Sequence, residues 1–444
     1  MKRSILRVIK LFLLIIVIIW LSYSCKSTKT AFDPKDLSYL YNPLRNSINP
    51  RYGVYNQSDN ISVLSVKFFS IDLYFNEANP RGVPMALLYV SVQLYNISQG
   101  KTLADTVKYN LDIVKDVSRE EYLYHIPLKV DKGSDYVAEV KILDRIRQQM
   151  THTFVSFSTR SENNRYSFYA RGHFLHNELL NPAVRKGEYF NLIYNKKTID
   201  TLFVSYYKPY EGVPYAPNMI LPERSISSEP DTTIGLHYND TLPIMLPRKG
   251  IYLCSNDKKT DEGFALMNFG PSFPGMSTPE DMIEPLAYIA SDDEITALRS
   301  SIKPKVALDN FWIGCGGNIE KSRELIRIYY TRALYANLYF TSYREGWRTD
   351  RGMVYMIYGP PDKLYKTTAS ESWGYRKAEI RSSLGTRYTV KENYLFFNFK
   401  KLDNKFSDND YFLSRSETIV TYWDKAVASW RKGIVFRLDN PAEF

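Results

Sequence analysis

Apolar and polar residues alternate along most of residues 61–158, with the period of two that is typical of half-buried strands. Turn-forming sequences such as Asn79-Pro80-Arg81-Gly82 interrupt this alternation at short intervals. The predicted strands are Ile61–Phe69, Ile71–Phe75, Ala86–Tyr95, Val107–Val114, Tyr122–Val130, Tyr136–Leu143 and Met150–Phe157. About seven short strands in roughly 100 residues predict a β-sandwich of immunoglobulin-like type over residues 61–160.

A second, less regular group of strands follows, and it predicts another β-sandwich-like domain over residues 161–275. A proline-rich loop crosses residues 208–222 in the middle of this group. The predicted strands here are Tyr166–Ala170, Tyr189–Tyr194, Leu202–Tyr207, Gly250–Cys254 and Gly263–Phe269.

The pattern changes at residue 277 to the three- and four-residue spacing of helices. Thr278 before Pro279, and Ser291 three residues before Glu294, are helix N-cap signals. Helices are predicted over residues 279–290, 292–301, 305–313 and Ile319–Phe340, and strands over Met353–Tyr358, Ser372–Tyr375, Tyr394–Lys400 and Tyr411–Ser416. We therefore expect a multidomain fold, in which two immunoglobulin-like β-domains precede an α+β domain (residues 276–444) with helices first and a small antiparallel sheet after.

The first 25 residues are typical of an exported protein. A basic start precedes the apolar run Leu11–Leu21, whose length suits a signal peptide, because spanning a bilayer takes about 20 residues. The sequence Leu21-Ser22-Tyr23-Ser24-Cys25 resembles the lipobox of bacterial lipoproteins. The resemblance implies that residues 1–24 are removed and that the thiol of Cys25 is acylated. The alternative is an uncleaved signal anchor with an unmodified cysteine.

The segment after Cys25 indicates where such a lipoprotein resides. Lys26 replaces the aspartate that retains many lipoproteins in the inner membrane, and no acidic residue precedes Asp33. We therefore expect a lipid-anchored protein of the outer membrane, on its periplasmic face. Residues 25–60 are predicted to form a tether, although residues 37–43 are too apolar for a free linker and are expected to pack against a domain.

Composition adds three constraints. The 36 tyrosines and an aromatic content of 15% favour strands. The net charge of +10 includes four bases within the first 24 residues, and the remaining +6 is too weak and too evenly spread to favour nucleic acid. It suits contact with an anionic lipid or polymer. Three cysteines exclude a disulfide framework, although a Cys254–Cys315 pair is left open.

Few residues suit catalysis. The five histidines end at His237, which excludes a histidine triad or a histidine-ligated zinc site in the C-terminal domain. His173 and His176 with Glu178 form only a weak metal pattern. Residues 314–322 resemble a phosphate loop, but Glu320 occupies the required glycine position, so Asn318 is predicted to cap the long helix instead.

The paired acids of the C-terminal domain are expected to be solvated, because they stand in helix-cap and turn contexts. These pairs are Asp292/Asp293 and Asp408/Asp410. We assign no catalytic residue, metal or cofactor.

One string is far more specific than these patterns. The residues that carry it are Gly346, Trp347, Thr349 and Asp350, followed by Gly359, Pro360, Pro361 and Asp362. With Trp373, Tyr375 and Phe311-Trp312, they resemble the GWxTD domain, a family of lipoproteins of the Bacteroidota, over residues 278–420. The resemblance implies a compartment and an architecture, but no catalytic activity.

The signature residues are expected to be structural. Glycine permits a tight helix exit, tryptophan packs in a core, and threonine and aspartate bond to nearby amides. The alternative is that Trp347, Arg348 and Arg351 line a groove for a peptide or glycan.

The sequence therefore predicts a non-enzymatic scaffold or accessory subunit of an envelope protein complex, serving outer-membrane protein insertion, secretion or gliding. The alternative is a protein that binds glycan or peptidoglycan, or an envelope enzyme that acts on glycan, with aromatic side chains as stacking surfaces. Aromatic residues clustered around one cleft would favour that alternative.

Overall fold

The computed structural model describes residues 36–43, 47–77, 82–174, 177–180, 182–185, 187–195, 199–217, 229–377 and 393–439. The chain divides into two compact units, Met1–Asp36 and Leu37–Phe444. The predicted signal peptide, Cys25 and the first part of the tether lie outside the described residues. In the part that is described, no helix combines the length and the apolar character needed to cross a membrane.

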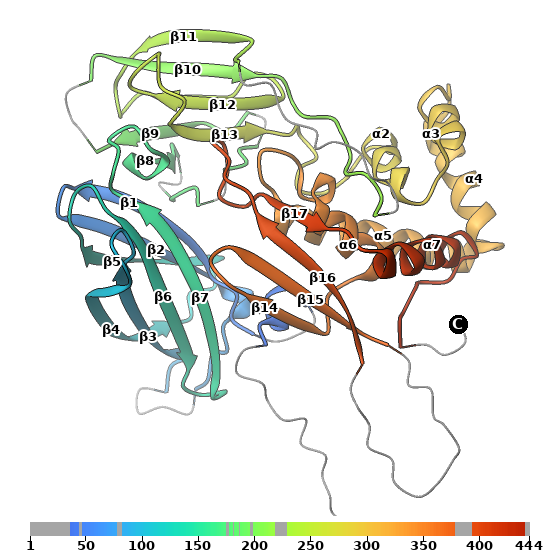
Figure 1. Cartoon of the computed structure of the whole chain (residues 1–444), viewed down its shortest axis with the longest axis horizontal. Coiled ribbons are helices and arrows are strands. Elements are labelled where there is room, and N and C mark those ends of the chain that lie inside the picture. The colour runs from blue at the N-terminus through green and yellow to red at the C-terminus, as the bar shows by residue number, and fades with distance from the viewer. Residues whose placement is uncertain are drawn as a thin grey trace, which may run out of the picture. The chain divides into compact units, whose positions relative to one another are not determined.

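The predicted fold class is confirmed. Antiparallel β-sheets come first, and a helical region, a four-stranded antiparallel sheet and a C-terminal helix follow them (Figure 1).

Two sheets enclose the first core. Alternate residues such as Val66, Phe68, Val90 and Leu94 from the two sheets are buried against one another. One sheet has the strand order β1-β2-β5 and the other β4-β3-β6-β7. Their strands are β1 (Arg51–Ser58), β2 (Ile61–Phe69), β3 (Met85–Asn96), β4 (Thr102–Val114), β5 (Glu121–Lys129), β6 (Asp135–Asp144) and β7 (Gln149–Ser158).

Two details of this region differ from the prediction. Strand β1 pairs with β2 along most of its length, although it falls within the predicted tether. Residues Ile71–Phe75 form no strand, because the chain turns at Ser70–Asp72 and leaves Ile71 92% exposed. A hydrophobic residue without a cross-strand partner gives no strand, whatever its propensity.

The second β-rich region has one sheet with the order β11-β10-β12-β13 and a two-stranded pair, β8-β9. Strand β12 is buried at every position, since Tyr252 and Cys254 face the core of this region while Ile251 and Leu253 face Tyr343 and Phe406 of the C-terminal domain. The strands are β8 (Phe168–Gly172), β9 (Phe190–Tyr194), β10 (Thr201–Tyr207), β11 (Thr232–His237), β12 (Gly250–Ser255) and β13 (Phe264–Asn268).

The helices begin where the cap signals place them. Thr278 and Ser291 both form complete capping boxes, and the Asn318 side chain accepts a hydrogen bond from the Lys321 amide. The helices are α2 (Pro279–Ile283), α3 (Asp292–Arg299), α4 (Pro304–Gly316), α5 (Ile319–Phe340), α6 (Asp350–Tyr358) and α7 (Glu417–Arg431).

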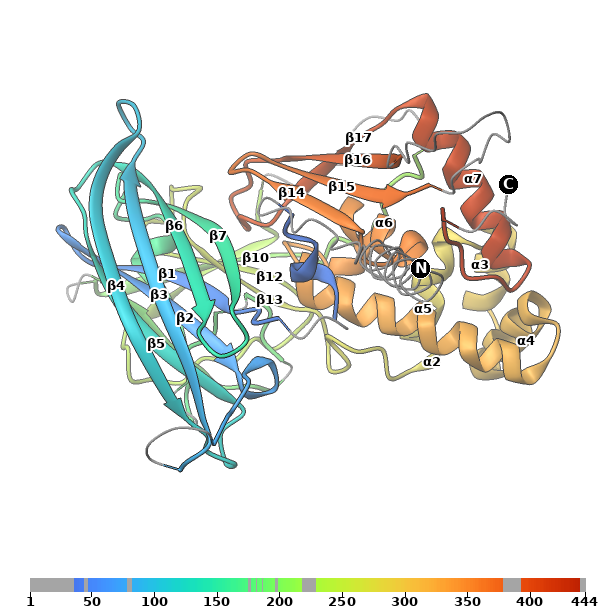
Figure 2. The same ribbon diagram turned by 90° about the horizontal axis from the view of Figure 1, so that it is seen from below.

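The last sheet has the order β14-β15-β16-β17, and Figure 2 shows α6 between this sheet and α5. Its strands are β14 (Lys363–Lys366), β15 (Ser370–Arg376), β16 (Tyr394–Lys401) and β17 (Tyr411–Ser414). The predicted strand Met353–Tyr358 is wrong, because these residues belong to α6. All nine residues of α6 are buried, so the helix shows no apolar stripe, and a short apolar run of this kind does not distinguish a helix from a strand.

The N-terminal segment packs against the C-terminal domain, as its apolar character predicted. The Leu37 amide donates to the Leu364 carbonyl oxygen at 2.7 Å, which joins the segment to β14. Tyr41 is buried among Phe340, Trp373 and Tyr339 of the C-terminal core. Tyr355 in α6 donates a hydrogen bond to the Tyr41 carbonyl oxygen at 2.9 Å.

A buried carboxylate lies at the centre of this junction. Four groups converge on Glu371 of β15, which is 1% exposed. They are the Tyr41 hydroxyl (2.9 Å), Arg351 Nη1 (3.0 Å), Lys366 Nζ (3.1 Å) and Trp373 Nε1 (3.1 Å). Burial alone would raise the pKa of Glu371, but Arg351 and Lys366 outweigh that effect and lower it to about 2.

The Glu371→Gln variant keeps the shape of the side chain but leaves Arg351 and Lys366 without their carboxylate. We expect it to lose about 3–5 kcal/mol of unfolding free energy at neutral pH. The pKa of Glu371 is about 2 in the folded state and 4.5 in the unfolded chain. The carboxylate therefore contributes its full stabilisation above pH 4.5, and this stabilisation is lost as the pH falls from 4.5 toward 2.

The loss of stability and its pH dependence are tested by measuring the melting temperatures of the wild type and of Glu371→Gln from neutral pH down to about 2. The gap in melting temperature should narrow as the pH falls, and Glu262→Gln, which alters an exposed glutamate, should follow the wild type. A gap that stays constant down to the lowest pH would contradict the assignment.

Candidate functional site

The signature residues lie between the end of α5 and the start of α6. Residues Gly346–Arg348 form a single 3₁₀ turn, and Thr349 caps α6. The Thr349 hydroxyl donates to the Gly346 carbonyl oxygen at 2.7 Å and accepts from the Gly352 amide at 3.0 Å. One side chain therefore closes the turn and starts the helix.

Two glycines are required here by close packing of the backbone. A Cβ atom on Gly346 would lie 1.9 Å from the Ala336 carbonyl oxygen of α5. A Cβ atom on Gly352 would lie 1.9 Å from the Gly346 carbonyl oxygen. A side chain at Gly346 would push the turn away from α5, and a side chain at Gly352 would push α6 away from the turn.

Trp347 is a core residue. Its side chain is 1% exposed and packs edge-on against Tyr288, whose hydroxyl donates to the Trp347 carbonyl oxygen at 2.6 Å. The neighbouring Arg348 is also buried, and its guanidinium bonds to Glu345 at 2.7 Å and to the Glu211 carbonyl oxygen at 2.6 Å.

Asp350 and Arg351 are also enclosed. Asp350 Oδ2 accepts a hydrogen bond from the Leu413 amide of β17 at 2.7 Å. Burial raises the pKa of Asp350, while the Leu413 amide, Arg344 and Arg415 oppose the rise. Arg351 is 1% exposed, between Glu371 and the ring of Tyr411.

The second half of the signature forms the exit from α6. Gly359 has a φ of 81°, a conformation that favours glycine, and its carbonyl oxygen accepts from the Tyr375 hydroxyl at 2.8 Å. Pro360 and Pro361 follow, and Asp362 accepts from the Arg376 amide at 2.8 Å, which fixes the start of β14 against β15. The residues of the signature thus sit in turns, caps and packed contacts of the C-terminal core.

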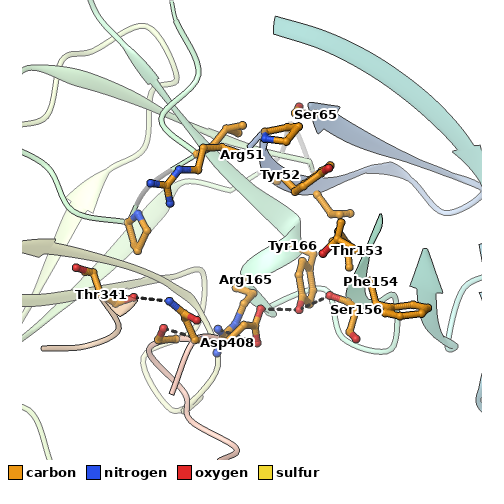
Figure 3. A pocket seen from close by; sticks show the side chains of 18 of the residues that line it. Arg51, Tyr52, Ser65, Thr153, Phe154, Ser156, Arg165, Tyr166, Thr341 and Asp408 are labelled. Carbon is orange, nitrogen blue, oxygen red and sulfur yellow. Dashed lines mark hydrogen bonds and ion pairs between the residues drawn. The ribbon is translucent and has the colours of Figure 1, made fainter. Parts of the chain in front are cut away.

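A cavity of about 460 Å³ lies elsewhere, where the three regions of the fold meet (Figure 3). Its volume is in the range of small-molecule sites, about 300–1,000 Å³. Residues of β1 and β7 form one wall, residues around η3 (Arg165–Ser167) and β8 a second, and the ends of α5, β14 and β16 a third.

Hydrogen bonds and an ion pair join the walls of the cavity, and Figure 3 marks them with dashed lines. Arg165 pairs with Asp408 at 3.0 Å, and the Tyr166 hydroxyl lies 2.8 Å from Asp408 Oδ2 and 3.1 Å from the Ser156 carbonyl oxygen. Burial and the nearby Asp408 raise the pKa of Tyr166 well above its usual value, so this hydroxyl stays neutral.

Tyrosine dominates the aromatic lining of the cavity. Tyr52, Tyr55, Tyr169 and Tyr339 are half-buried, so part of each remains accessible. The lining residues span positions 40 to 411, and no local motif marks the site. The sequence pattern therefore does not predict this cavity, and only the high tyrosine content of the chain relates to it.

Residues 250–432 match the GWxTD domain. The match covers 183 residues and begins upstream of the predicted boundary at residue 276. Strands β12 and β13 explain the earlier start, because Ile251 and Met267 pack with Tyr343 and Phe406 in one apolar cluster. The GWxTD domain therefore includes two strands that the sequence pattern assigned to the preceding region.

No curated protein matches the chain. Among solved structures, it is similar to a β-glucuronidase of Bacteroides uniformis (15% identity, TM-score 0.18), covering 34% of this chain and 16% of that one. A second, β-glucuronidase 2 of the same species, bound covalently to cyclophellitol-6-carboxylate aziridine, gives 16% identity and a TM-score of 0.18, covering 39% and 17%. A putative β-galactosidase from Bacteroides fragilis gives 12% identity and a TM-score of 0.17, covering 34% and 19%. The chain thus spans less than a fifth of the length of each of these proteins.

The possible metal ligands and the two cysteines noted in the sequence form no site among the described residues. Leu175 and His176 lie outside the described residues, while His173 contacts Asn191 and Glu178 accepts from Ser65. Within the residues that are described, no three potential ligands gather into a metal site. Cys254 and Cys315 are both buried free thiols, and burial raises the pKa of Cys254 to about 12.

The paired acids differ from one another. Asp292 and Asp293 lie exposed in the first turn of α3. Asp410 is 2% exposed and lies 3.4 Å from Arg344, so the expectation that it is solvated is wrong. Asp410 lies immediately before β17, where Arg344 and the Asn404 side chain approach its carboxylate.

The Trp347→Ala variant of the GWxTD domain should be strongly destabilised, because it leaves a large cavity in a packed core. We expect a loss of about 3–5 kcal/mol. Asp350→Ala should cost about 1–3 kcal/mol, since the Leu413 amide is left buried without an acceptor. Asp403→Ala, at an exposed position, is the matched control and should melt like the wild type. Chemical denaturation measures all three, and a Trp347→Ala protein of normal stability that had lost a binding activity would reassign the signature to a binding site.

Proposed function

We propose that the chain is a lipid-anchored protein of the outer membrane, facing the periplasm, that serves as a non-enzymatic scaffold or accessory subunit of an envelope assembly. The observation that supports a scaffold is the way in which the GWxTD domain is bonded to the β-rich regions. Three contacts contribute: Arg165 pairs with Asp408 at 3.0 Å, Arg348 donates to the Glu211 carbonyl oxygen at 2.6 Å, and Arg415 donates to the Tyr215 carbonyl oxygen at 3.0 Å.

These polar contacts surround an apolar one. Phe406 of the GWxTD domain packs edge-on against Tyr207 at 4.8 Å between ring centroids. A partly exposed ion pair such as Arg165–Asp408 contributes only about 0–1 kcal/mol, so the apolar contact supplies more of the stability. A molecule joined in this way offers partners surfaces in a fixed arrangement, which favours a scaffold.

The proposed anchor rests on the apolar run Leu11–Leu21 and on Cys25, whose acyl chains would each add about 0.8 kcal/mol per buried methylene. Cys25→Ala should release the protein from membranes or leave an uncleaved precursor. Ser27→Ala, two residues further on, should behave as the wild type. Membrane fractionation shows whether each variant stays on the membrane, and the mass of the product shows whether residues 1–24 have been removed. Normal retention with normal processing in Cys25→Ala would exclude lipidation.

The proposed periplasmic face rests on the lack of acidic residues before Asp33. Protease added to intact cells should leave the protein whole, and the same protease should digest it once the outer membrane is permeabilised. Complete digestion on intact cells would instead place the chain on the cell surface.

The proposed assembly is tested by affinity purification from solubilised outer membrane, followed by mass spectrometry. We expect envelope proteins to co-purify with the wild type and to retrieve this chain when they are tagged in turn. A chain that migrates as a monomer after cross-linking in cells would contradict the scaffold.

A second function, binding of glycan, is favoured by one observation. The half-buried tyrosines gather around a single cavity, and such aromatic faces suit the flat apolar sides of sugar rings. Co-sedimentation with purified peptidoglycan distinguishes this role, since a scaffold without glycan affinity stays in solution.

A further inference from the structure

The cavity where the three regions meet carries an excess of positive charge. Its lining includes four basic side chains and two acidic ones: Arg51, Arg165, Lys366 and Lys401 against Glu178 and Asp408. The rest of the lining that the structure describes carries no charged carboxylate, lysine or arginine, and it includes His152 and the amides of Asn49 and Asn409. A cavity with low-dielectric walls concentrates such a field.

Contacts within the protein account for part of this charge. Arg165 pairs with Asp408 at 3.0 Å, and Lys366 pairs with the buried Glu371 at 3.1 Å. Glu178 accepts from the Ser65 hydroxyl at 2.7 Å and lies 3.6 Å from His125. Both acids of the lining, and two of its bases, therefore already have partners.

Arg51 and Lys401 remain. Within the described ranges, no carboxylate forms an ion pair with either side chain. The acids that act on them do so from further away, Asp72 on Arg51 and Asp408 on Lys401. Burial nevertheless lowers the pKa of both groups, which indicates that water compensates their charge poorly.

Regular structure holds both cations in place. Arg51 is the first residue of β1 and is paired with Lys67 of β2. Lys401 is the last residue of β16 and continues the inward face formed by Leu395, Phe397 and Phe399. Figure 3 shows Arg51 extending from its strand into the cavity, toward the wall that carries Thr341 and Asp408.

The two cations also approach the same buried cluster from different sheets. Tyr41 and Lys366 line the same cavity as Arg51 and Lys401. Tyr41 and Lys366 both contact the same oxygen of Glu371. A cation held in a desolvated position without a partner opposes folding, so a ligand that supplies the missing negative charge would explain the arrangement.

We propose that this cavity binds a small anionic ligand, whose carboxylate or phosphate group is held by Arg51 and Lys401. Guanidinium and ammonium groups are the usual protein partners of both anions. The exposed faces of Tyr52 and Tyr339 then contact the ring or apolar portion of the ligand. This proposal goes beyond the scaffold role and does not depend on it.

Calorimetric titration of the detergent-solubilised full chain tests the proposal. The probes are inorganic phosphate, glycerol phosphate, glucuronic acid and, as a neutral counterpart, glucose. We expect at least one anion to bind at least tenfold more tightly than glucose, and its affinity to fall as salt is added. Glucuronic acid as the best probe identifies an acidic sugar, and glycerol phosphate as the best probe identifies a lipid-type headgroup. Failure of all three anions to bind overturns the proposal.

Variants tie the binding to the two cations. Arg51→Gln and Lys401→Met should each weaken the best anion at least tenfold. The matched controls are Lys400→Met, at the adjacent exposed position of β16, and Arg323→Gln, on the exposed side of α5, and both should bind as the wild type does. Anion binding that is unchanged in the Arg51→Gln/Lys401→Met double variant would overturn the assignment.

The melting temperature of the ligand-free protein tests the proposal independently of the binding titrations. If the two charges are held for a ligand, Lys401→Met should melt at or above the wild-type temperature, because it removes a desolvated charge that has no partner. The same variant should lose the rise in melting temperature that the anion gives the wild type. A Lys401→Met protein that is clearly less stable than the wild type would show that the lysine serves the fold instead.

Discussion

The junction between the N-terminal segment and the C-terminal domain depends on one buried carboxylate. Glu371 receives donors from four elements, η1 (Ser38–Tyr41), α6, β14 and β15, so none of them can move without exposing a charge. Arg351 extends this control to the cavity, because it also bonds to the Asn409 carbonyl oxygen at 2.9 Å. The Asn409 side chain in turn donates to the carbonyl oxygens of Tyr339 and Thr341, which line the cavity.

The parts of the fold that the sequence predicted best are those in which local signals and burial agree. Helix α5 begins and ends where it was predicted, because Asn318 caps it and its apolar spacing reaches Phe340. In helix α6 the local pattern and the burial disagree. All of its residues are buried, so its sequence is a continuous apolar run that predicts a strand. Strand β1 was assigned to the tether because its pairing with β2 is a property of the tertiary structure.

The signature and the cavity also differ in how well the sequence predicts them. The signature stands in one short stretch, so both its family and a structural role were predictable, and Trp347 is indeed buried. The cavity is assembled from residues spread over positions 40 to 411, so no short stretch of sequence marks it. Lys401 carries one weak signal, because it continues the alternation of Leu395, Phe397 and Phe399, although the predicted strand ends at Lys400.

The docking of Tyr41 has a mechanical consequence. Any tension applied to the N-terminus enters the compact unit at Leu37 and Tyr41, and so loads the strand contact to Leu364 and the Glu371 cluster first. The sheets built from β1 to β7 follow later in the chain and are shielded from that force until the docked segment detaches. Under such tension, resistance at the N-terminal side would come first from the buried ionic cluster of the GWxTD domain and only later from the sheets.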